Sequence, residues 1–104
     1  MTEFKNVTIK AAANVYFDGK VTSRTIEFTD GSIKTLGIML PGEYEFSTNA
    51  PESMEIISGK LEVLLPNTNE WLTVNSNDSF KVIGNSKFQL KIHELTDYCC
   101  TFIS

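Results

Sequence analysis

Short runs of β-forming residues, broken at even intervals by turn residues, constrain this 104-residue chain more than any other feature. Asp18-Gly19, Asp30-Gly31, Pro41-Gly42 and Gly84-Asn85-Ser86 separate successive runs, and Asp-Gly between alternating residues is a strong hairpin signal. No convincing helix interrupts them. The pattern predicts about ten strands that close into an antiparallel β-barrel or jelly roll.

The order of the runs gives a strand-by-strand expectation. We expect strands over residues 14–17, 20–29, 32–40, 43–46, 54–57, 61–65, 70–74, 80–82, 88–92 and 98–103. In the centre, Met54 and Ile56 are expected to meet Leu61 and Val63 across a tight turn at residues 58–60. We assign residues 14–104 to one barrel domain, and residues 1–13 to an N-terminal extension or edge strand.

The charge balance limits the partners. Nine Lys and Arg against thirteen Asp and Glu give a formal net charge of −4, whereas a non-specific nucleic-acid binder needs a basic face. Residues 1–6 carry charges where the apolar part of a signal peptide would lie, and no apolar run reaches the length of a membrane span. We expect a cytoplasmic protein that binds neither nucleic acid nor membrane. A barrel this small leaves much surface exposed, which favours a dimer.

The two cysteines are neighbours, Cys99 and Cys100. Adjacent strand residues point to opposite faces, so a disulfide between them would be strained, and in a reducing compartment both are expected to be free thiols. Cys100 shares its parity with Tyr98 and Phe102 and is expected in the core.

Two segments have the spacing of the motifs with which cupins bind a metal, but without the histidines. The first cupin motif resembles glycine, five residues, His-x-His, a short spacer, then Glu, six residues and glycine. Counting forward from Gly42 places Thr48 and Ala50 at the histidine positions. Counting back from Gly59 places Glu52 at the carboxylate position.

The second motif also lacks its histidine, because Phe88 stands at that position. The single histidine, His93, shares its parity with Gln89 and Lys91 and is expected on the surface. A metal held by imidazoles needs two or three of them. The sequence therefore predicts no metal site held by histidines, and for a site of carboxylates alone a single Glu52 supplies too few ligands. We expect no cofactor.

Several longer motifs carry a closer resemblance. These are Tyr16-Phe17-x-Gly19-Lys20-Val21, Gly42-Glu43-Tyr44-x-Phe46-Ser47-Thr48, Met54-x-x-Ile57-Ser58-Gly59 and Val63-Leu64-Leu65-Pro66. From about residue 14 onward the chain resembles the small single-domain cupins of the pyrimidine/purine nucleoside phosphorylase family, and departs from them near Ile83, where relatives tend to have proline. The resemblance implies a homodimer that uses inorganic phosphate, and no metal, to convert purine and pyrimidine nucleosides to free base and pentose 1-phosphate.

That reaction suggests roles for individual residues, because N-glycosidic cleavage passes through an oxocarbenium-like sugar. Lys20, with the hydroxyls of Ser47 and Thr48, is expected to hold phosphate. Glu52 is expected to bind the ribose hydroxyls or to support the developing positive charge. Tyr16, Phe17, Met54 and Phe88 offer flat or soft apolar surface to a base, and such stacking accepts any base.

Each role has a structural alternative. Lys20 would also serve as a solvated charge after a turn, and Ser47 and Thr48 as hydroxyls that satisfy turn backbone. Phe88 would also serve as core filling, and Glu52 as a surface residue. The missing histidines equally suit a second hypothesis, a non-catalytic cupin that binds or senses a small molecule without forming product.

Overall fold

The computed structural model describes residues 3–103 and consists almost entirely of β-strands. The strands are β1 (Thr8–Ile9), β2 (Asn14–Tyr16), β3 (Val21–Glu27), β4 (Ile33–Met39), β5 (Gly42–Ser47), β6 (Glu52–Leu64), β7 (Trp71–Asn75), β8 (Ser79–Val82) and β9 (Lys87–Phe102). One 3-10 turn, η1 (Phe17–Gly19), follows β2, and no α-helix occurs in residues 3–103. Nothing in this range is helical over a length that would cross a membrane.

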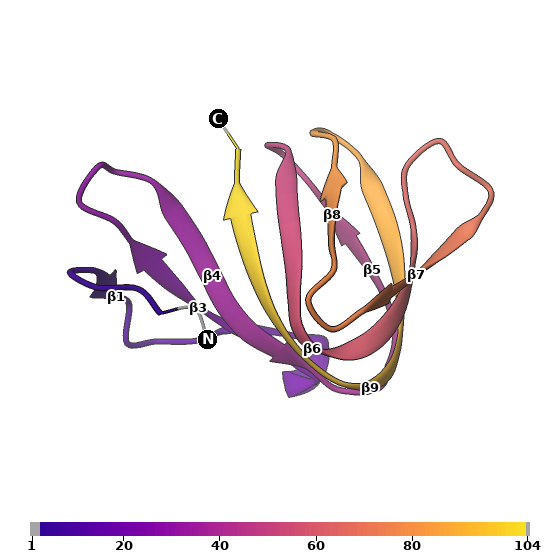
Figure 1. Ribbon diagram of the computed structural model, residues 1–104, viewed down its shortest axis with the longest axis horizontal. Coiled ribbons are helices and arrows are strands. Elements are labelled where there is room, and N and C mark those ends of the chain that lie inside the picture. Colours follow the sequence, from indigo (N-terminus) through magenta and orange to yellow (C-terminus); the bar gives the residue numbers. More distant parts are fainter. Residues whose placement is uncertain (1–2, 104) are drawn as a thin grey trace.

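The nine strands form one antiparallel sheet that folds back on itself (Figure 1). The long strands β6 and β9 run side by side through the bend, so each contributes to both limbs. The first limb contains β3, β4, the C-terminal half of β9, the N-terminal half of β6, and β8. The second limb contains β5, the N-terminal half of β9, the C-terminal half of β6, and β7. This two-layered closure confirms the predicted single-domain all-β jelly roll.

The predicted hairpin at residues 58–60 is wrong. β6 continues without a break from Glu52 to Leu64, and both of its halves pair with β9. Its register shifts between Ile56 and Leu61, and Gly59 lies within the shift with a φ of 118°. The buried positions change from even to odd numbers there, which we interpreted as a turn between two strands. A register irregularity changes the parity in the same way without ending the strand.

The predicted separation of residues 88–92 from residues 98–103 is also wrong, because both belong to the 16-residue strand β9. The strand count is therefore nine rather than about ten. The Asp30-Gly31 hairpin between β3 and β4 is confirmed. Gly31 has a φ of 88° and its N–H donates to the Phe28 carbonyl over 3.0 Å. Asp30 closes the turn by accepting a bond of 2.9 Å from the Ser32 N–H.

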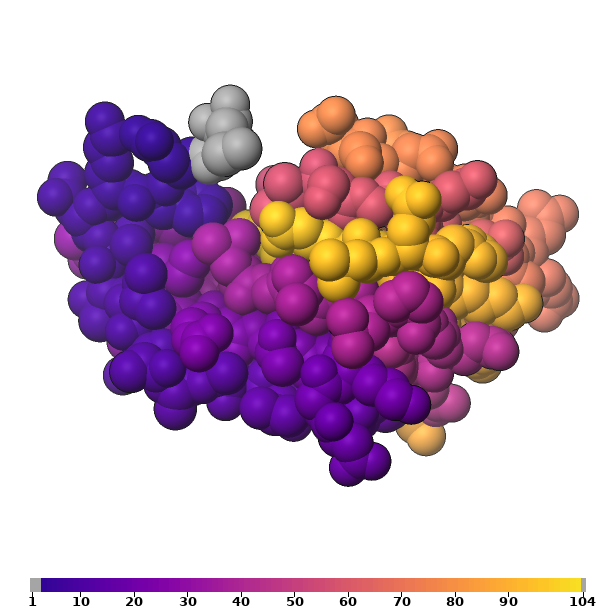
Figure 2. Space-filling model, turned by 90° about the horizontal axis from the view of Figure 1, so that it is seen from below, coloured from indigo at the N-terminus to yellow at the C-terminus, as the bar shows by residue number. Residues whose placement is uncertain are grey.

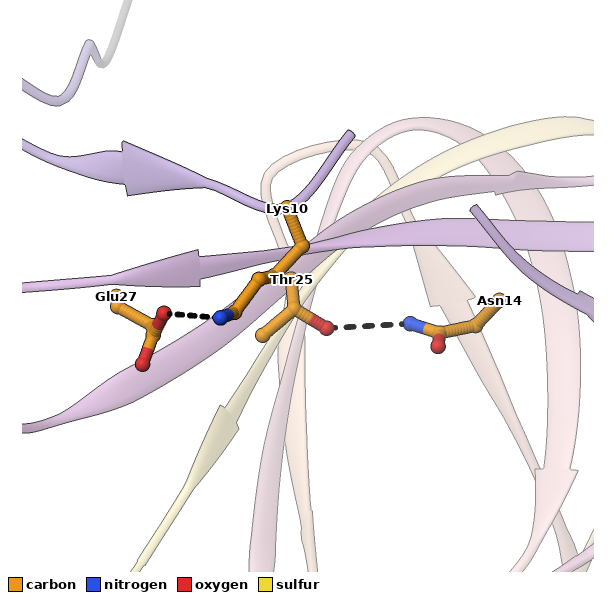
Figure 3. Close-up of polar contacts among 4 residues, drawn as sticks. All are labelled: Lys10, Asn14, Thr25 and Glu27. Atoms are coloured by element: carbon orange, nitrogen blue, oxygen red, sulfur yellow. Dashed lines mark hydrogen bonds and ion pairs between the residues drawn. The ribbon is translucent and has the colours of Figure 1, made fainter. Parts of the chain in front are cut away.

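The N-terminal residues add an edge to the first limb. β1 and β2 both pair with β3. Lys10 lies 3.1 Å from the Glu27 carboxylate, and the Asn14 amide donates to the Thr25 hydroxyl over 3.2 Å (Figure 3). Figure 2 shows these indigo residues gathered at the end of the molecule opposite the orange loops near β7 and β8. The first limb is thus extended by the segment that precedes residue 14.

The core lies between the two limbs. Its buried members are Val21, Met39, Tyr44, Met54, Ile56, Leu61, Val63, Val74, Phe80, Val82, Phe88, Leu90, Ile92, Tyr98 and Cys100. Both β6 and β9 contribute to it along most of their length, so burial of these side chains holds the bend closed.

Candidate active site

A cavity of about 470 Å³ lies between the two limbs, within the size range of small-molecule sites. The first limb supplies Ser23, Thr35, Met39, Glu52, Met54, Tyr98, Cys100 and Phe102 to its lining, and the second supplies Phe46, Ser47 and Phe88. Tyr16 from β2, with Asn49 and Ala50 from the loop before β6, completes it. The bend of β6 and β9 therefore brings distant parts of the chain around one space.

Aromatic rings form one wall of the cavity. Phe46 on β5 pairs with Phe88 on β9 in the sheet register, and their ring centroids lie 5.9 Å apart at an interplanar angle of 25°. Tyr16 meets Phe46 edge-on, with centroids 5.9 Å apart. Stacked and edge-on pairs are the favoured aromatic geometries. The wall therefore offers a rigid, flat apolar surface.

Glu52 is the one residue with a formal charge in the lining formed by the described residues. It begins β6 directly after Pro51, and it pairs with Phe102 on one side and Val82 on the other. Burial raises the pKa of its half-buried carboxyl above the usual 4.5, and a hydrogen bond from the Cys100 thiol partly opposes that rise. The cavity thus presents one acidic group against mostly apolar walls.

A phenol and two hydrogen-bonded side chains lie in the first limb. Burial raises the pKa of Tyr98 to about 12, although the Ser23 hydroxyl opposes the rise. The Asn14 amide donates to the same Ser23 hydroxyl over 3.2 Å. Gly37 is the β4 residue between Ser23 and Tyr98 in the register, so no side chain separates them there. Tyr98 is therefore a neutral hydrogen-bonding group at physiological pH.

Cys100 contributes a thiol that is also kept neutral. Burial raises its pKa most, and the neighbouring Glu52 carboxylate raises it further, while the Thr35 hydroxyl opposes both. Thiolates, not thiols, are nucleophiles, so this cysteine is not a nucleophile. Both cysteines are free and Cys100 belongs to the core, as the sequence predicted. Cys99 is buried as well.

Five of the predicted site residues line the cavity: Tyr16, Ser47, Glu52, Met54 and Phe88. They come from four strands, and Met54 and Phe88 are buried. Phe88 fills the core and lines the cavity at the same time.

The other three predicted residues lie outside the lining. Lys20 is exposed after η1. Phe17 packs behind the aromatic wall, with its ring centroid 4.9 Å from that of Tyr44. Thr48 is buried, and its hydroxyl donates to the Ile83 carbonyl over 2.7 Å and accepts from the Ser86 N–H over 3.1 Å. Within this chain Thr48 therefore acts as a clamp between two loops.

His93 lies on the surface, as predicted, and its Nε2 is 3.3 Å from the Glu62 carboxylate. Among residues 3–103 no three histidine, cysteine or acidic side chains gather in a way that could hold a metal.

Sequence reasoning missed several lining residues as site members, among them Ser23, Thr35, Tyr98 and Cys100. Their inward-facing parity was a usable signal, because a small polar residue on the buried face of a strand needs a partner. The sequence does not show which strands adjoin, so it cannot bring β3, β4 and β9 together.

The closed jelly roll and its internal cavity define a cupin. The chain resembles a crystal structure of an RmlC-like cupin from Shewanella frigidimarina with a TM-score of 0.70 and 14% identity, over 97% of this chain and 86% of that one. It resembles a solved protein of unknown function from Acinetobacter sp. ADP1 far more closely, with a TM-score of 0.94 and 41% identity over 97% of this chain and 98% of that one.

Within the cupins, this chain belongs to the pyrimidine/purine nucleoside phosphorylase family, whose model matches residues 11–102. The proteins of that name from Geotalea uraniireducens and Colwellia psychrerythraea are 58% and 57% identical to it, over 99% and 100% of both chains.

Proposed function

We propose that this protein cleaves purine and pyrimidine nucleosides by phosphorolysis, without a metal, and so transfers a pentosyl group to phosphate. The observation that carries the proposal is Glu52, a half-buried carboxyl that faces an aromatic-walled cavity of small-molecule size. A departing base leaves an oxocarbenium-like sugar, and a carboxylate in a poorly solvated site stabilises that charge strongly. Membership of the family supports the same activity.

The aromatic wall suits the base. The Phe46–Phe88 pair and Tyr16 provide ring faces and edges, and Met54 provides a soft apolar contact from the opposite limb. Stacking discriminates little among bases because every base has a π-face. This wall therefore supports a broad range of nucleosides.

Phosphate is the nucleophile in this scheme, and it is already charged at neutral pH. An oxygen of phosphate bonds to C1′ of the sugar as the C1′–N bond breaks. The base leaves with the electron pair of that bond and takes up the proton that phosphate gives up. The Ser47 hydroxyl and the Asn49 amide lie on the lining and are suited to donate to phosphate. Lys20, which lies outside the lining, would act by attracting the anion at longer range.

We also propose a cytoplasmic homodimer. Val15 and Ile38 both pair with Thr22 in the sheet register and are exposed by 60% and 41%. Neighbouring exposed apolar residues of this kind are typical of a surface that is covered by a partner.

A panel of purified nucleosides, each incubated with and without phosphate, tests the activity. Free base and pentose 1-phosphate are expected only when phosphate is present. Equal release of base in phosphate-free buffer would mean hydrolysis and would refute the proposal. Glu52→Gln is the matched variant, because it keeps the size of the side chain and removes its charge.

One observation favours a second function, a binding or sensing module. No lysine or arginine belongs to the described lining, although phosphate prefers such partners. Saturable nucleoside binding measured by calorimetry, with no product at any phosphate concentration, would establish this second function instead.

A further inference from the structure

The loop between β5 and β6 and the loop between β8 and β9 are joined by hydrogen bonds at Thr48. The Thr48 N–H donates to the Ser86 carbonyl over 2.8 Å, and the Ser86 N–H donates to the Thr48 hydroxyl over 3.1 Å. The Thr48 hydroxyl lies 2.7 Å from the Ile83 carbonyl oxygen and 3.3 Å from that of Ser86. Figure 1 shows the two loops side by side at one end of the sheet. One buried residue therefore holds together two segments that lie 35 residues apart in sequence.

The segment around Thr48 also lines the cavity. Ser47 and Asn49, on either side of Thr48, belong to the lining, whereas Thr48 itself and residues 83–86 lie outside it. Alternate residues of an extended segment point to opposite sides, which explains why Thr48 meets the second loop while its two neighbours meet the cavity. The second loop therefore acts on the cavity through the segment that Thr48 holds.

The Thr48 hydroxyl has no proton left for a ligand. A hydroxyl carries one proton and two lone pairs. Two carbonyl oxygens next to the Thr48 hydroxyl compete for its proton, and the Ser86 N–H occupies one of its lone pairs. Only 4% of Thr48 is exposed. An effect of Thr48 on phosphate therefore passes through its neighbours rather than through its own hydroxyl.

Asn49 is the lining residue whose position depends most on this contact. It lies outside the strands, and its carbonyl accepts a hydrogen bond of 3.1 Å from the Asn85 N–H in the second loop. Ser47 and Glu52, by contrast, are held by ladder pairing with β9. Loss of the contact between the loops should therefore move Asn49 and leave Ser47 and Glu52 in place.

Gly84 lets the second loop come close enough to make these bonds. A Cβ at Gly84 would lie 2.7 Å from the Asn49 carbonyl oxygen and 3.2 Å from Cδ of Pro51. Gly84 does not have a positive φ, so the lack of space rather than the backbone conformation requires glycine there. Any larger residue would push directly on the backbone of Asn49.

We propose that Thr48 and Gly84 are positioning residues, which place Asn49 where its side-chain amide donates to phosphate. The catalytic consequence rests on the proposed phosphorolysis, in which Asn49 contacts phosphate and Glu52 contacts the sugar. Because Glu52 is held by the sheet, loss of the contact between the loops weakens phosphate binding and spares the steps that depend on Glu52.

Thr48→Val tests the role of the hydroxyl, because it removes that group and keeps the branched shape of the side chain. The KM for phosphate is expected to rise about tenfold, while the KM for nucleoside and kcat at saturating phosphate stay within about twofold. Thr48→Ser, which retains the hydroxyl, is expected to restore the KM for phosphate. An unchanged KM for phosphate in Thr48→Val, or an equal rise in both KM values, would overturn the proposal.

Thr68→Val is the matched control, because the Thr68 hydroxyl also donates to a backbone carbonyl, that of Leu65, over 2.8 Å, but outside the cavity. Both KM values are expected to stay unchanged in this variant, and a rise in the KM for phosphate as large as in Thr48→Val would overturn the proposal. If Thr48→Val does not fold, Gly84→Ala decides, since its Cβ pushes on Asn49 from the second loop. The same selective rise in the KM for phosphate is expected, and no rise would overturn the proposal.

Binding of inorganic phosphate alone separates the failure of this proposal from the failure of the proposed function. Titration of ¹⁵N-labelled wild type with phosphate is expected to shift the side-chain amide signals of Asn49, which Asn49→Ala assigns. In Thr48→Val, about tenfold more phosphate is expected to be needed for the same shift. Equal affinities, or no shift in the wild type, would overturn the positioning role. Absence of phosphorolysis in the wild type would reject the proposed function, while this titration would still decide the role of Thr48.

Discussion

The two halves of β6 face the same interior but present different chemistry to it. In the C-terminal half, Leu61 and Val63 are completely buried and pair with Ile92 and Leu90 of β9. In the N-terminal half, the inward-facing residues begin with Glu52, which is opposite Phe102 and diagonally across from Cys100 on β9. The C-terminal half of β6 packs against apolar side chains, whereas the N-terminal half borders the cavity, where ionisable and hydroxyl groups lie among apolar ones.

The difference shows how a single pair of strands serves both stability and chemistry. Burial of apolar side chains stabilises the packing around the C-terminal half of β6. Around the N-terminal half, burial raises the pKa values of Glu52, Tyr98 and Cys100. Because the Glu52 carboxylate loses solvation there, it lowers the stability of the folded protein at neutral pH. Between the halves, the register shift around Gly59 lets each half keep its own pairing with β9.

The largest effect is expected from Leu61→Ala, which changes the packed C-terminal half of β6. Removing this completely buried side chain is expected to lower the free energy of unfolding by about 3 kcal/mol. Met54→Ala is the control on the same strand, and it should lose less because Met54 already borders the cavity. Urea denaturation of both variants measures the difference. Equal losses would mean that the two halves do not differ in packing.

Glu52→Gln changes the N-terminal half of β6, which borders the cavity. We expect kcat/KM for nucleoside to fall about a hundredfold, which corresponds to a rise of about 2.7 kcal/mol in the activation barrier. Glu70→Gln, at an exposed acid directly before β7, is the control and should keep wild-type activity. Phosphorolysis measured by chromatography gives both values. Wild-type activity in Glu52→Gln would remove this residue from the mechanism.

Gly59→Ala tests the junction between the halves, with an expected loss of about 2 kcal/mol in stability. A Cβ there would lie 2.8 Å from the Leu95 carbonyl oxygen, and the φ of +118° is unfavourable for alanine. Gly31→Ala is the control, because its φ of +88° is also positive but nothing lies within 4 Å of a Cβ. Thermal denaturation should show the larger loss for Gly59→Ala, and the reverse order would contradict a crowded junction.

The same Glu52→Gln variant should be more stable than the wild type at neutral pH, by a few degrees in Tm. The pKa of Glu52 is raised in the folded state, so its stabilising contribution is full below about pH 4.5 and is lost as the pH rises through the folded value. The difference in Tm should therefore shrink as the pH falls from neutrality through the raised folded value, and should be small below about pH 4.5. A difference that stays constant from pH 7 to pH 4 would argue against desolvation of this carboxyl.

The smallest effect is expected for Lys20→Ala, outside the cavity. The KM for phosphate should change less than about threefold at physiological salt, and the change should vanish at high salt because solvent screens an exposed charge. Steady-state kinetics at two salt concentrations measures it. A loss of kcat comparable to that of Glu52→Gln would show that Lys20 reaches the substrate.

Local patterns predicted much of the fold. The turn at Asp30-Gly31 and the inward parity of Cys100 depend only on residues near in sequence, and both predictions were confirmed. The hairpin at residues 58–60 was wrong because parity alone does not distinguish a turn from a register shift. That choice depends on pairing with β9, which lies far along the chain.

For the candidate site, too, some features were predictable from local sequence and others depended on the tertiary structure. The sequence by itself determined an all-β cupin without the histidines of a metal site, and it marked Glu52 by its spacing from Gly59. Only the tertiary structure decided that Thr48 clamps two loops, that Lys20 lies outside the cavity, and that Cys100 lines the same cavity as Glu52. The physical reason is that spacing and parity are local properties, whereas desolvation and hydrogen bonding depend on which distant strands become neighbours.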